Sequence, residues 1–135
     1  MIAEHGKDKI MKRIKIAAGS DDGKIINQHF GFAEQFAIFE WEPENDRHRF
    51  LEFRKTERAC NLGSHDEKKL VSTIRLLNDC AVVLVSNIGE GAQQITQANG
   101  LQVLKIGGRV DDALKKLKES KYLKKQLNTE RSVGI

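Results

Sequence analysis

Three side chains with metal-binding or nucleophilic chemistry lie in polar segments between the apolar stretches of this 135-residue chain. His29 stands within "INQHFGFAEQFAIFE" (26–40), and Cys60 and His65 share the segment "RACNLGSH" (58–65). An imidazole has a reference pKa of about 6.5, so a neutral ring nitrogen is available at pH 7. The pattern around His29 is typical either of a tight turn that packs its own aromatic side chains or of an imidazole held out for a ligand.

Cys60 falls between a charged strand and the start of a helix in the predicted element order. Thiolates are favoured near helix amino termini and basic groups, and Arg58 is close in sequence. Cys60 is therefore either a reactive thiol or an ordinary loop cysteine, and the residue types leave both interpretations open. His65, in the first turn of the same predicted helix, is typical of a surface histidine. His5 and His48 have no such context.

The two cysteines of the chain are too few for a disulfide framework, and we expect free thiols in a reducing compartment. Cys80 begins the apolar run "CAVVLVS" and is predicted to be a buried small hydrophobe. A protein that assembles an ordinary iron–sulfur cluster supplies four thiolates. The composition therefore excludes a conventional ferredoxin-like site.

Two further patterns bear on catalysis and on nucleotide binding. Two-metal phosphodiester chemistry needs several carboxylates converging on the sheet, whereas the first strand, "IKIAA" (14–18), contains none. Asp21 and Asp22 precede Gly23 and are predicted to form a turn. The segment "SNIGEGA" (86–92) opens a helix but lacks the third glycine and the Lys-Ser/Thr pair of nucleotide motifs. Its amides suit an anion, and no enzymatic site is expected.

Hydrophobic periodicity predicts one mixed α/β domain over residues 13–119. Strands are expected over 13–19, 25–26, 36–42, 47–56, 80–86 and 101–107, and helices over 64–79, 90–100 and 109–120. The main elements follow the order β-β-β-α-β-α-β-α. Three antiparallel strands thus precede two parallel βα units, which gives a mixed five-stranded sheet with helices packed on it, the ribonuclease H-like arrangement.

The helix boundaries and buried faces follow from local signals. Ser64, with Glu67 three residues on, is predicted to form a capping box at the start of the first helix. Asn99 and Gly100 are predicted to close the second helix. In the first and third helices, the residues expected to face the protein core are Leu70, Val71, Ile74, Leu77, Val110, Ala113, Leu114 and Leu117.

The strands differ in their expected positions within the sheet. Residues 36–42 are apolar on both faces and are predicted to lie in its interior, after which "PEND" (43–46) has the composition of a turn. The arginines of 47–56 are typical of an edge strand. The continuous apolar runs at 80–86 and 101–107 indicate strands covered on both faces.

The net charge of +4 is concentrated at the two ends of the chain. Residues 1–13 contribute +2 and residues 120–135 contribute +3, whereas 14–119 carry −1. We expect basic arms over 1–12 and 120–135, and no specific nucleic-acid partner. No apolar run approaches the roughly 18 residues of a membrane-spanning helix, and the N-terminus lacks a signal-peptide centre. A cytoplasmic protein without a membrane partner is therefore expected.

Three segments together resemble the nitrogenase iron–molybdenum cofactor biosynthesis family over roughly residues 13–119. They are "IAAGSDDGKIINQHFGFAEQFAIFE" (16–40), "RACNLGSH" (58–65) and "LLNDCAVVLVSNIGEGAQQITQANGLQVL" (76–104). The family includes NifX- and NafY-type cofactor carriers and the domain appended to the C-terminus of NifB. The most specific element is Gln28-His29-Phe30-Gly31.

The resemblance implies a ribonuclease H-like fold and binding of the iron–molybdenum cofactor or its iron–sulfur precursor. Carried onto this sequence, it makes His29 the first candidate ligand, within an element shared with Phe30 and Gly31. Cys60 is the second candidate, and His65 is a third. The metal ligands implied are His29 and Cys60, and the partners implied are the metallocluster and the cofactor-assembly or acceptor proteins.

The chemistry of such a role differs from cluster assembly. A preassembled cluster has metals satisfied mostly by internal sulfide, so one imidazole and one thiolate suffice to dock it, and few bonds allow its release. Such clusters are anionic, and helix-start amides at 64–67 or 89–92 suit them, although Asp66 and Glu67 oppose the charge. The sequence therefore predicts a non-enzymatic carrier. The alternative is a regulatory or protein–protein interaction domain of the same fold without a bound cluster.

Overall fold

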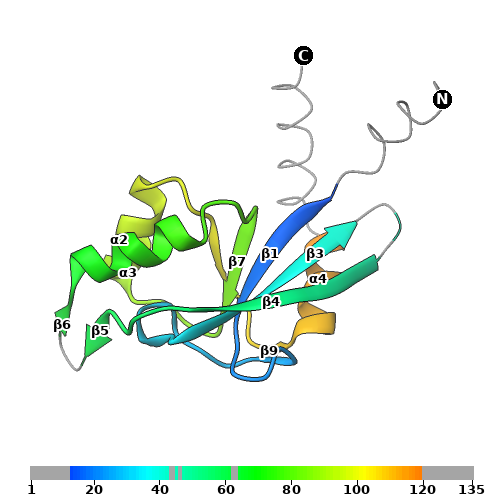
Figure 1. The fold of residues 1–135 in the computed structure, drawn as a ribbon, viewed down its shortest axis with the longest axis horizontal. Helices are drawn as coiled ribbons and strands as arrows, with labels where there is room; N and C mark the ends of the chain where they lie inside the picture. Colours follow the sequence, from blue (N-terminus) through cyan, green and yellow to red (C-terminus); the bar gives the residue numbers. More distant parts are fainter. Residues whose placement is uncertain (1–12, 43–44, 46, 62–63, 120–135) are drawn as a thin grey trace, which may run out of the picture.

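A five-stranded mixed sheet forms the centre of the molecule (Figure 1). The computed structural model describes residues 13–42, 45, 47–61 and 64–119. Its strands lie in the order β4-β3-β1-β7-β8. Their bounds are Ile14–Gly19 for β1, Gln35–Glu42 for β3, Arg47–Lys55 for β4, Val82–Val85 for β7 and Val103–Lys105 for β8. The expected arms, 1–12 and 120–135, lie outside the described residues, as does the turn at 43–46 apart from Asn45.

Strand directions confirm the predicted mixed sheet. β1 pairs antiparallel with β3 and parallel with β7, β3 pairs antiparallel with β4, and β7 pairs parallel with β8. β3 lies inside the sheet and β4 at its edge, as the apolar and charged patterns predict. The carboxyl ends of β1 and β7 therefore meet at one end of the sheet, and their amino ends meet at the other.

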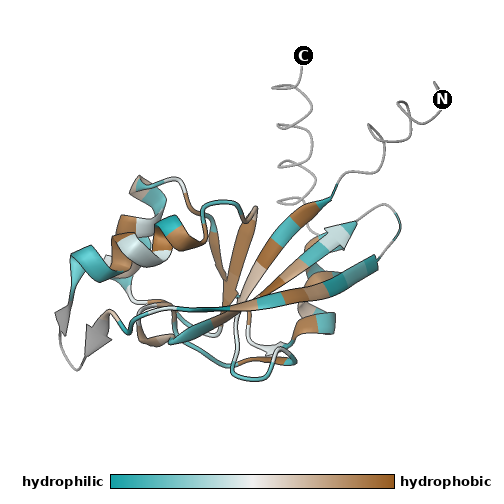
Figure 2. Cartoon of the chain, in the orientation of Figure 1, coloured by the Kyte–Doolittle hydropathy of each residue, from teal (hydrophilic) through white to brown (hydrophobic). Residues whose placement is uncertain are grey.

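Helices cover both faces of the sheet (Figure 1). α2 (Glu67–Leu76) and α3 (Glu90–Ala98) pack on one face, and α4 (Val110–Glu119) packs on the other. The apolar strand segments lie between them, as Figure 2 shows by hydropathy. The α4 side of the core includes Ile14, Ile16, Phe39, Trp41 and Val82, and the α2–α3 side includes Phe30, Phe36, Ile38, Leu70 and Val83.

The predicted helix faces are largely those observed. Leu70, Ile74 and Leu77 are buried, while Val71 of the same stripe is half-buried. The four α4 residues expected to face the core, Val110, Ala113, Leu114 and Leu117, are all buried. Asn99 is the C-cap of α3, and Gly100 follows with φ of +79°, a left-handed conformation that glycine adopts without strain.

The predicted start of the first helix is wrong. Ser64 and His65 form a short strand, β6, so Ser64 does not cap the helix and His65 is not in its first turn. Asp66 is the N-cap, and its carboxylate accepts hydrogen bonds from the amides of Lys68 and Lys69. Aspartate caps as well as serine does, and the two-residue offset leaves Ser64 free to pair in a hairpin.

The expectation that 101–107 is a strand buried on both faces is also wrong. β8 has only three residues, lies at the edge of the sheet, and leaves Val103 and Leu104 half-buried. A strand with one neighbouring strand has fewer residues packed around it than an interior strand. Burial predicted from its apolar residues alone is therefore too high. β7, between β1 and β8, is buried throughout.

Two small strand pairs complete the fold. β2 (Ile25–Ile26) pairs with β9 (Gly108–Arg109), and β5 (Cys60–Asn61) pairs with β6 (Ser64–His65). Asp22 accepts hydrogen bonds from the amides of Lys24 and Ile25, which confirms the turn predicted after β1. In the part of the chain described, no helix has the length and apolarity needed to cross a bilayer.

Candidate functional site

The His29 segment runs across the carboxyl ends of β1 and β7. The Gln28 amide donates to the Gly19 carbonyl (3.1 Å), and the Ser86 amide donates to the Gln28 carbonyl (3.0 Å). One residue on, His29 forms a parallel bridge with Asn87, at which the Phe30 amide donates to the Asn87 carbonyl (2.9 Å). In open α/β sheets, ligands bind outside the carboxyl ends of the strands.

Gly19 permits this close crossing. A Cβ atom at this position would lie 3.0 Å from Cβ of Gln28 and 3.4 Å from the Gln28 carbonyl oxygen. Both atoms belong to the segment that carries His29, so a larger residue at the end of β1 would displace that segment. The glycine therefore fixes how near the histidine lies to the sheet.

The His29 side chain is exposed at this crossing. Its ring lies edge-on to Phe32, with centroids 6.0 Å apart and planes inclined by 69°. Among the described residues, neither ring nitrogen has a hydrogen-bond partner. His29 is the N-cap residue of the short 3-10 helix η1 (Phe30–Phe32), and its side chain makes no capping hydrogen bond. The imidazole is thus oriented by an aromatic neighbour and keeps its nitrogens available to a ligand.

Phe30 and Gly31 anchor the His29 loop through buried contacts. Phe30 is 2% exposed and packs against Phe36, with ring centroids 5.9 Å apart. Gly31 is buried, and its carbonyl accepts a hydrogen bond from the Ala59 amide at 2.9 Å. These two candidate residues shape the segment on which His29 is presented.

The Gly31–Ala59 hydrogen bond also joins the His29 loop to the β5–β6 hairpin. The Asp66 amide donates to the Ala59 carbonyl at 2.7 Å, which closes the base of that hairpin. Within it, Cys60 and His65 are directly opposite each other in the register. The backbone therefore collects all three candidate ligands at one corner, although the side chains of Cys60 and His65 lie outside the described part of the structure.

A contact that sequence reasoning missed lies between this hairpin and the loop. The guanidinium carbon of Arg58 lies 4.8 Å from the centroid of the Phe32 ring, in a cation–π contact. Phe32 thus contacts both His29 and Arg58. Phe32 and Arg58 are 26 positions apart in the sequence, and no local spacing signals that they meet.

The two helix amino termini at this corner differ. In α2 the Asp66 carboxylate occupies the amides of Lys68 and Lys69, so that terminus is already satisfied. In α3 the N-cap is Gly89, without a side-chain cap, and Glu90 is the acidic residue of the first turn. Of the two anion positions expected from sequence, only the start of α3, which follows the Asn87 bridge, retains uncapped amides.

No ready-made metal site is formed by the side chains that the structure describes, because no three His, Cys, Asp or Glu residues cluster there. Cys80 is 7% exposed, as predicted for a small buried hydrophobe. Burial, reinforced by the neighbouring Asp79 carboxylate, raises the pKa of its thiol to about 12. Cys80 is therefore an unreactive thiol in the folded protein.

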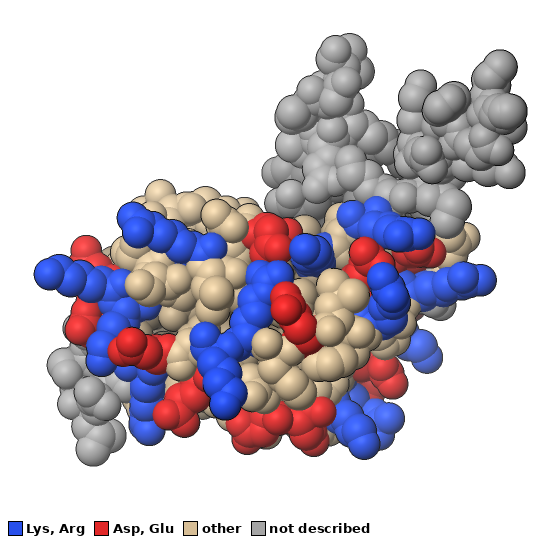
Figure 3. All heavy atoms as spheres, in the orientation of Figure 1, with Lys and Arg blue, Asp and Glu red and all other residues tan. Residues whose placement is uncertain are grey.

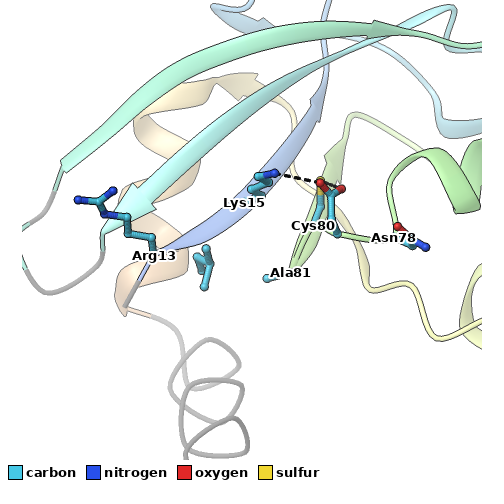
Figure 4. Close-up of a pocket in the computed structure, with 7 residues that line it drawn as sticks. Arg13, Lys15, Asn78, Cys80 and Ala81 are labelled. Carbon is cyan, nitrogen blue, oxygen red and sulfur yellow. Dashed lines mark hydrogen bonds and ion pairs between the residues drawn. The ribbon is translucent and has the colours of Figure 1, made fainter. Parts of the chain in front are cut away.

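A cavity of about 390 Å³ lies at the opposite end of the sheet, at the amino ends of β1 and β7 (Figure 4). Lys15 Nζ and Arg54 Nη2 lie 3.1 and 3.0 Å from Asp79 Oδ2, and Arg54 Nη1 donates to Asp79 Oδ1 at 2.8 Å. Hydrogen bonds from Arg54 hold the pKa of Asp79 well below its usual range. Each charge here has a partner, which is the pattern of a structural ion cluster.

The wider surface carries both signs of charge. Figure 3 shows Lys and Arg interspersed with Asp and Glu over the face viewed. Arg13 contacts Glu42 at 2.9 Å, and Arg49 donates to Glu40 at 3.1 Å. The face viewed therefore presents charges of both signs.

Comparison with known proteins identifies relatives along most of the chain. The family model described as "Dinitrogenase iron-molybdenum cofactor" matches residues 12–120. The FeMo cofactor biosynthesis protein NifB of Frankia alni is 35% identical over 104 residues, covering 75% of this chain and 20% of NifB. Protein NifX of Azotobacter vinelandii is 32% identical over 107 residues, covering 77% of this chain and 65% of NifX.

This chain thus spans about a fifth of that NifB and slightly under two thirds of NifX. Two solved structures share its fold. The crystal structure of PH0822 superposes with a TM-score of 0.57 at 21% identity, covering 78% of this chain and 88% of the other. The NMR structure of a putative NifB protein from Thermotoga gives a TM-score of 0.52 at 22% identity, covering 79% and 89%.

Proposed function

The chain belongs to the dinitrogenase iron-molybdenum cofactor family, and from this premise we propose that it carries a preformed iron–molybdenum cofactor, or its iron–sulfur precursor, as cargo. The observation that carries the proposal is the exposed His29 imidazole at the carboxyl ends of β1 and β7. Family membership supports a role in cofactor biosynthesis. The binding role is our inference from the site.

One protein imidazole is enough to dock a cluster that arrives complete. Imidazole nitrogen is a common ligand for iron and other transition metals. The phenyl ring of Phe32 restricts the imidazole on one side. The uncapped amides at the start of α3 add a weak attraction for an anion, which the carboxylate of Glu90 partly offsets.

Cys60 and His65 are the second and third ligands of the proposal. The two residues pair directly across the β5–β6 hairpin, and the Ala59–Gly31 hydrogen bond ties that hairpin to the His29 loop. A thiolate from Cys60 would give a second bond to the cargo. Two protein bonds hold a cluster more weakly than the four of a resident site, which suits transfer to an acceptor.

The proposal describes a non-enzymatic carrier that acts in the cytoplasm with cofactor-assembly or acceptor proteins. Its fold is proposed to be ribonuclease H-like. Support comes from the sheet order β4-β3-β1-β7-β8, in which β3 runs in the direction opposite to the other four strands. No carboxylate lies in β1, where the nucleases of that arrangement need one.

Anaerobic titration of the purified protein with isolated iron–molybdenum cofactor tests the proposal. We expect co-elution of the cofactor with the wild-type protein and a spectral change on binding. His29→Ala is expected to lower the affinity about a hundredfold or more, because a metal–ligand bond is lost. Cys60→Ser is expected to weaken binding less.

His48→Ala is the matched control, since His48 is also exposed but lies on β4 and contacts Asp111 at 3.0 Å. It should bind as the wild type does. Absence of co-elution with wild-type protein, or equal binding by His29→Ala, would overturn the carrier proposal. If His29→Ala then lowered only the melting temperature, the loop would be a packing element of an interaction domain.

A further inference from the structure

Arg58 and His29 contact the same aromatic ring, that of Phe32. The guanidinium carbon of Arg58 lies 4.8 Å from the centre of the Phe32 ring, and that ring is in edge-to-face contact with the imidazole of His29. A planar guanidinium stacks on an aromatic face without giving up its outward donors. The contact therefore favours this position of Arg58, with the modest strength of an exposed pair, and leaves its N–H groups available.

The charge of Arg58 is not neutralised by the described residues around it. Arg58 is exposed, and within the described part of the chain no carboxylate lies within salt-bridge distance of it. The adjacent Glu57 contacts Lys69 instead, at 3.5 Å. By contrast, Arg54 contacts two carboxylates, Glu52 and Asp79. The cation beside the candidate ligand is thus one whose charge is available to an incoming group.

The backbone keeps Arg58 at this position. The next residue, Ala59, donates to Gly31 and accepts from Asp66, so Arg58 directly precedes a residue held at both its amide and its carbonyl. Gly31 lies between Phe30 and Phe32 in the same loop as His29. Because the imidazole and the guanidinium both contact the Phe32 ring, a ligand as large as a metal cluster that binds the imidazole comes within reach of the Arg58 charge.

We propose that Arg58 is the charge-recognition residue of this site, and that with His29 and Phe32 it selects an anionic, sulfide-rich metal cluster. Imidazole supplies the bond to metal, and the guanidinium supplies attraction and N–H donors to the anionic periphery. Charge-assisted hydrogen bonds are about twice as strong as neutral ones. The inference rests on the proposed carrier function and adds to it the source of selectivity for anions.

The test is an anaerobic titration of the full chain with isolated iron–molybdenum cofactor at about 0.1 M and about 1 M salt, where the Debye lengths are roughly 10 and 3 Å. Arg58→Gln is expected to lower affinity about tenfold at the lower salt, with the deficit shrinking at the higher salt. Arg58→Lys keeps the charge but loses the planar stack, so about a threefold loss is expected.

Arg47→Gln is the matched control. Arg47 is exposed and lies at the opposite end of β4 from Lys55, and a nine-residue strand spans roughly 27 Å. At that separation its charge is screened, and its removal should leave the affinity unchanged. Melting temperatures of all three variants establish that each is folded.

The outcomes separate the two proposals. If wild-type protein binds the cofactor through His29 but Arg58→Gln binds equally well at both salt concentrations, the charge-recognition role is wrong and the carrier function stands. If wild-type protein binds no cofactor, the carrier function and this inference both fail. A tenfold, salt-sensitive loss in Arg58→Gln with no loss in Arg47→Gln supports the inference.

Discussion

The amino and carboxyl ends of β1 and β7 present charged and polar groups in opposite ways. At the amino end, Lys15, Arg54 and Asp79 are joined by hydrogen bonds of 2.8–3.1 Å beside the buried thiol of Cys80. At the carboxyl end, His29 is exposed, and no described residue hydrogen-bonds to its ring nitrogens or pairs with the Arg58 charge.

This contrast separates polar groups that are satisfied within the fold from polar groups that are left available. A cluster whose charges are mutually satisfied contributes to stability and offers little to a ligand. An imidazole and a guanidinium held by aromatic contacts leave their polar atoms available, which is what the proposed binding role requires. The cavity of about 390 Å³ lies at the amino end, beside charges that are already paired, so a hollow alone does not identify a binding site.

The reactivity of the two cysteines gives the largest expected difference between the ends. Cys80 has its thiol pKa raised to about 12, whereas an ordinary cysteine has a pKa of about 8.5, so its thiolate fraction at pH 8 is roughly a thousandfold lower. We expect iodoacetamide to modify the folded chain once, at Cys60, as measured by mass spectrometry of digested protein. Rapid modification of Cys80 in folded protein would contradict the assignment of the amino end as closed.

Unfolding is the control for this experiment. In denaturant both thiols should react at similar rates, because burial and the Asp79 carboxylate no longer act on Cys80. In Cys60→Ser, iodoacetamide should react with the remaining thiol, Cys80, slowly in the folded state and rapidly in the unfolded state.

Gly19→Ala tests whether the carboxyl end depends on the close crossing of the loop. The new Cβ would lie 3.0 Å from Cβ of Gln28, and the loop must move to accommodate it. We expect a loss of about 2 kcal/mol in the free energy of unfolding, together with weaker cofactor binding. Denaturant melts and the anaerobic titration measure the two effects.

Gly107→Ala is the control, since a Cβ there would meet its nearest atoms at 3.6–3.8 Å, which is ordinary contact. It should change neither quantity by much. If Gly19→Ala binds cofactor as the wild type does, the position of the loop is not what presents His29.

Asp79→Asn probes the amino end, with a smaller expected effect. It leaves the Arg54 side chain, 15% exposed, without its bidentate partner, and Asp79 itself is 40% exposed, so solvent moderates the cost. We expect a loss of about 1–2 kcal/mol in the free energy of unfolding at pH 7, and unchanged cofactor binding. Reduced cofactor binding in this folded variant would break the separation of the two ends.

The pH dependence of the same variant follows from the direction of the pKa shift. Hydrogen bonds from Arg54 lower the pKa of Asp79 in the folded state, so its stabilisation is fully present above the ordinary carboxyl pKa of about 3.9. The stabilisation is lost as the pH falls from there towards the folded pKa. Wild-type stability should therefore decline more steeply in acid than that of Asp79→Asn, as urea melts at several pH values would record.

Glu90→Gln gives the smallest expected effect and examines the start of α3. Removing this carboxylate from an uncapped first turn should make the free energy of binding an anionic cofactor more favourable by about 0.5 kcal/mol. This corresponds to roughly a twofold gain in affinity. Glu67→Gln is the control, because the α2 amides are already occupied by Asp66. Equal gains in both variants would indicate a general charge effect and no specific role for α3.

The sequence determined much of the fold because its signals are local. The alternation in Ile14–Gly19 and the apolar run at Val82–Val85 predicted the central strands, and both are observed. The start of α2 was misplaced because Ser64 and Asp66 are both good caps, and only the pairing of Ser64 with Asn61 decides between them. Long-range pairing is not encoded in a local motif.

The candidate site was predicted in part for the same reason. His29 is a candidate ligand because of a contiguous motif, and the structure leaves its side chain exposed; its role as a ligand stays a prediction. The contact of Arg58 with Phe32 arises from a hydrogen bond between Ala59 and Gly31, which joins segments 28 residues apart. Such a contact depends on the tertiary fold and leaves no periodicity in the sequence.

Histidine ligation of the cargo is the central claim, and pulsed electron paramagnetic resonance of cofactor-loaded protein labelled with ¹⁵N-histidine tests it most directly. The account predicts a ¹⁵N hyperfine coupling in the wild type and in His48→Ala that is absent in His29→Ala. Loaded wild-type protein without any histidine coupling, or a coupling that persists in His29→Ala, would contradict it.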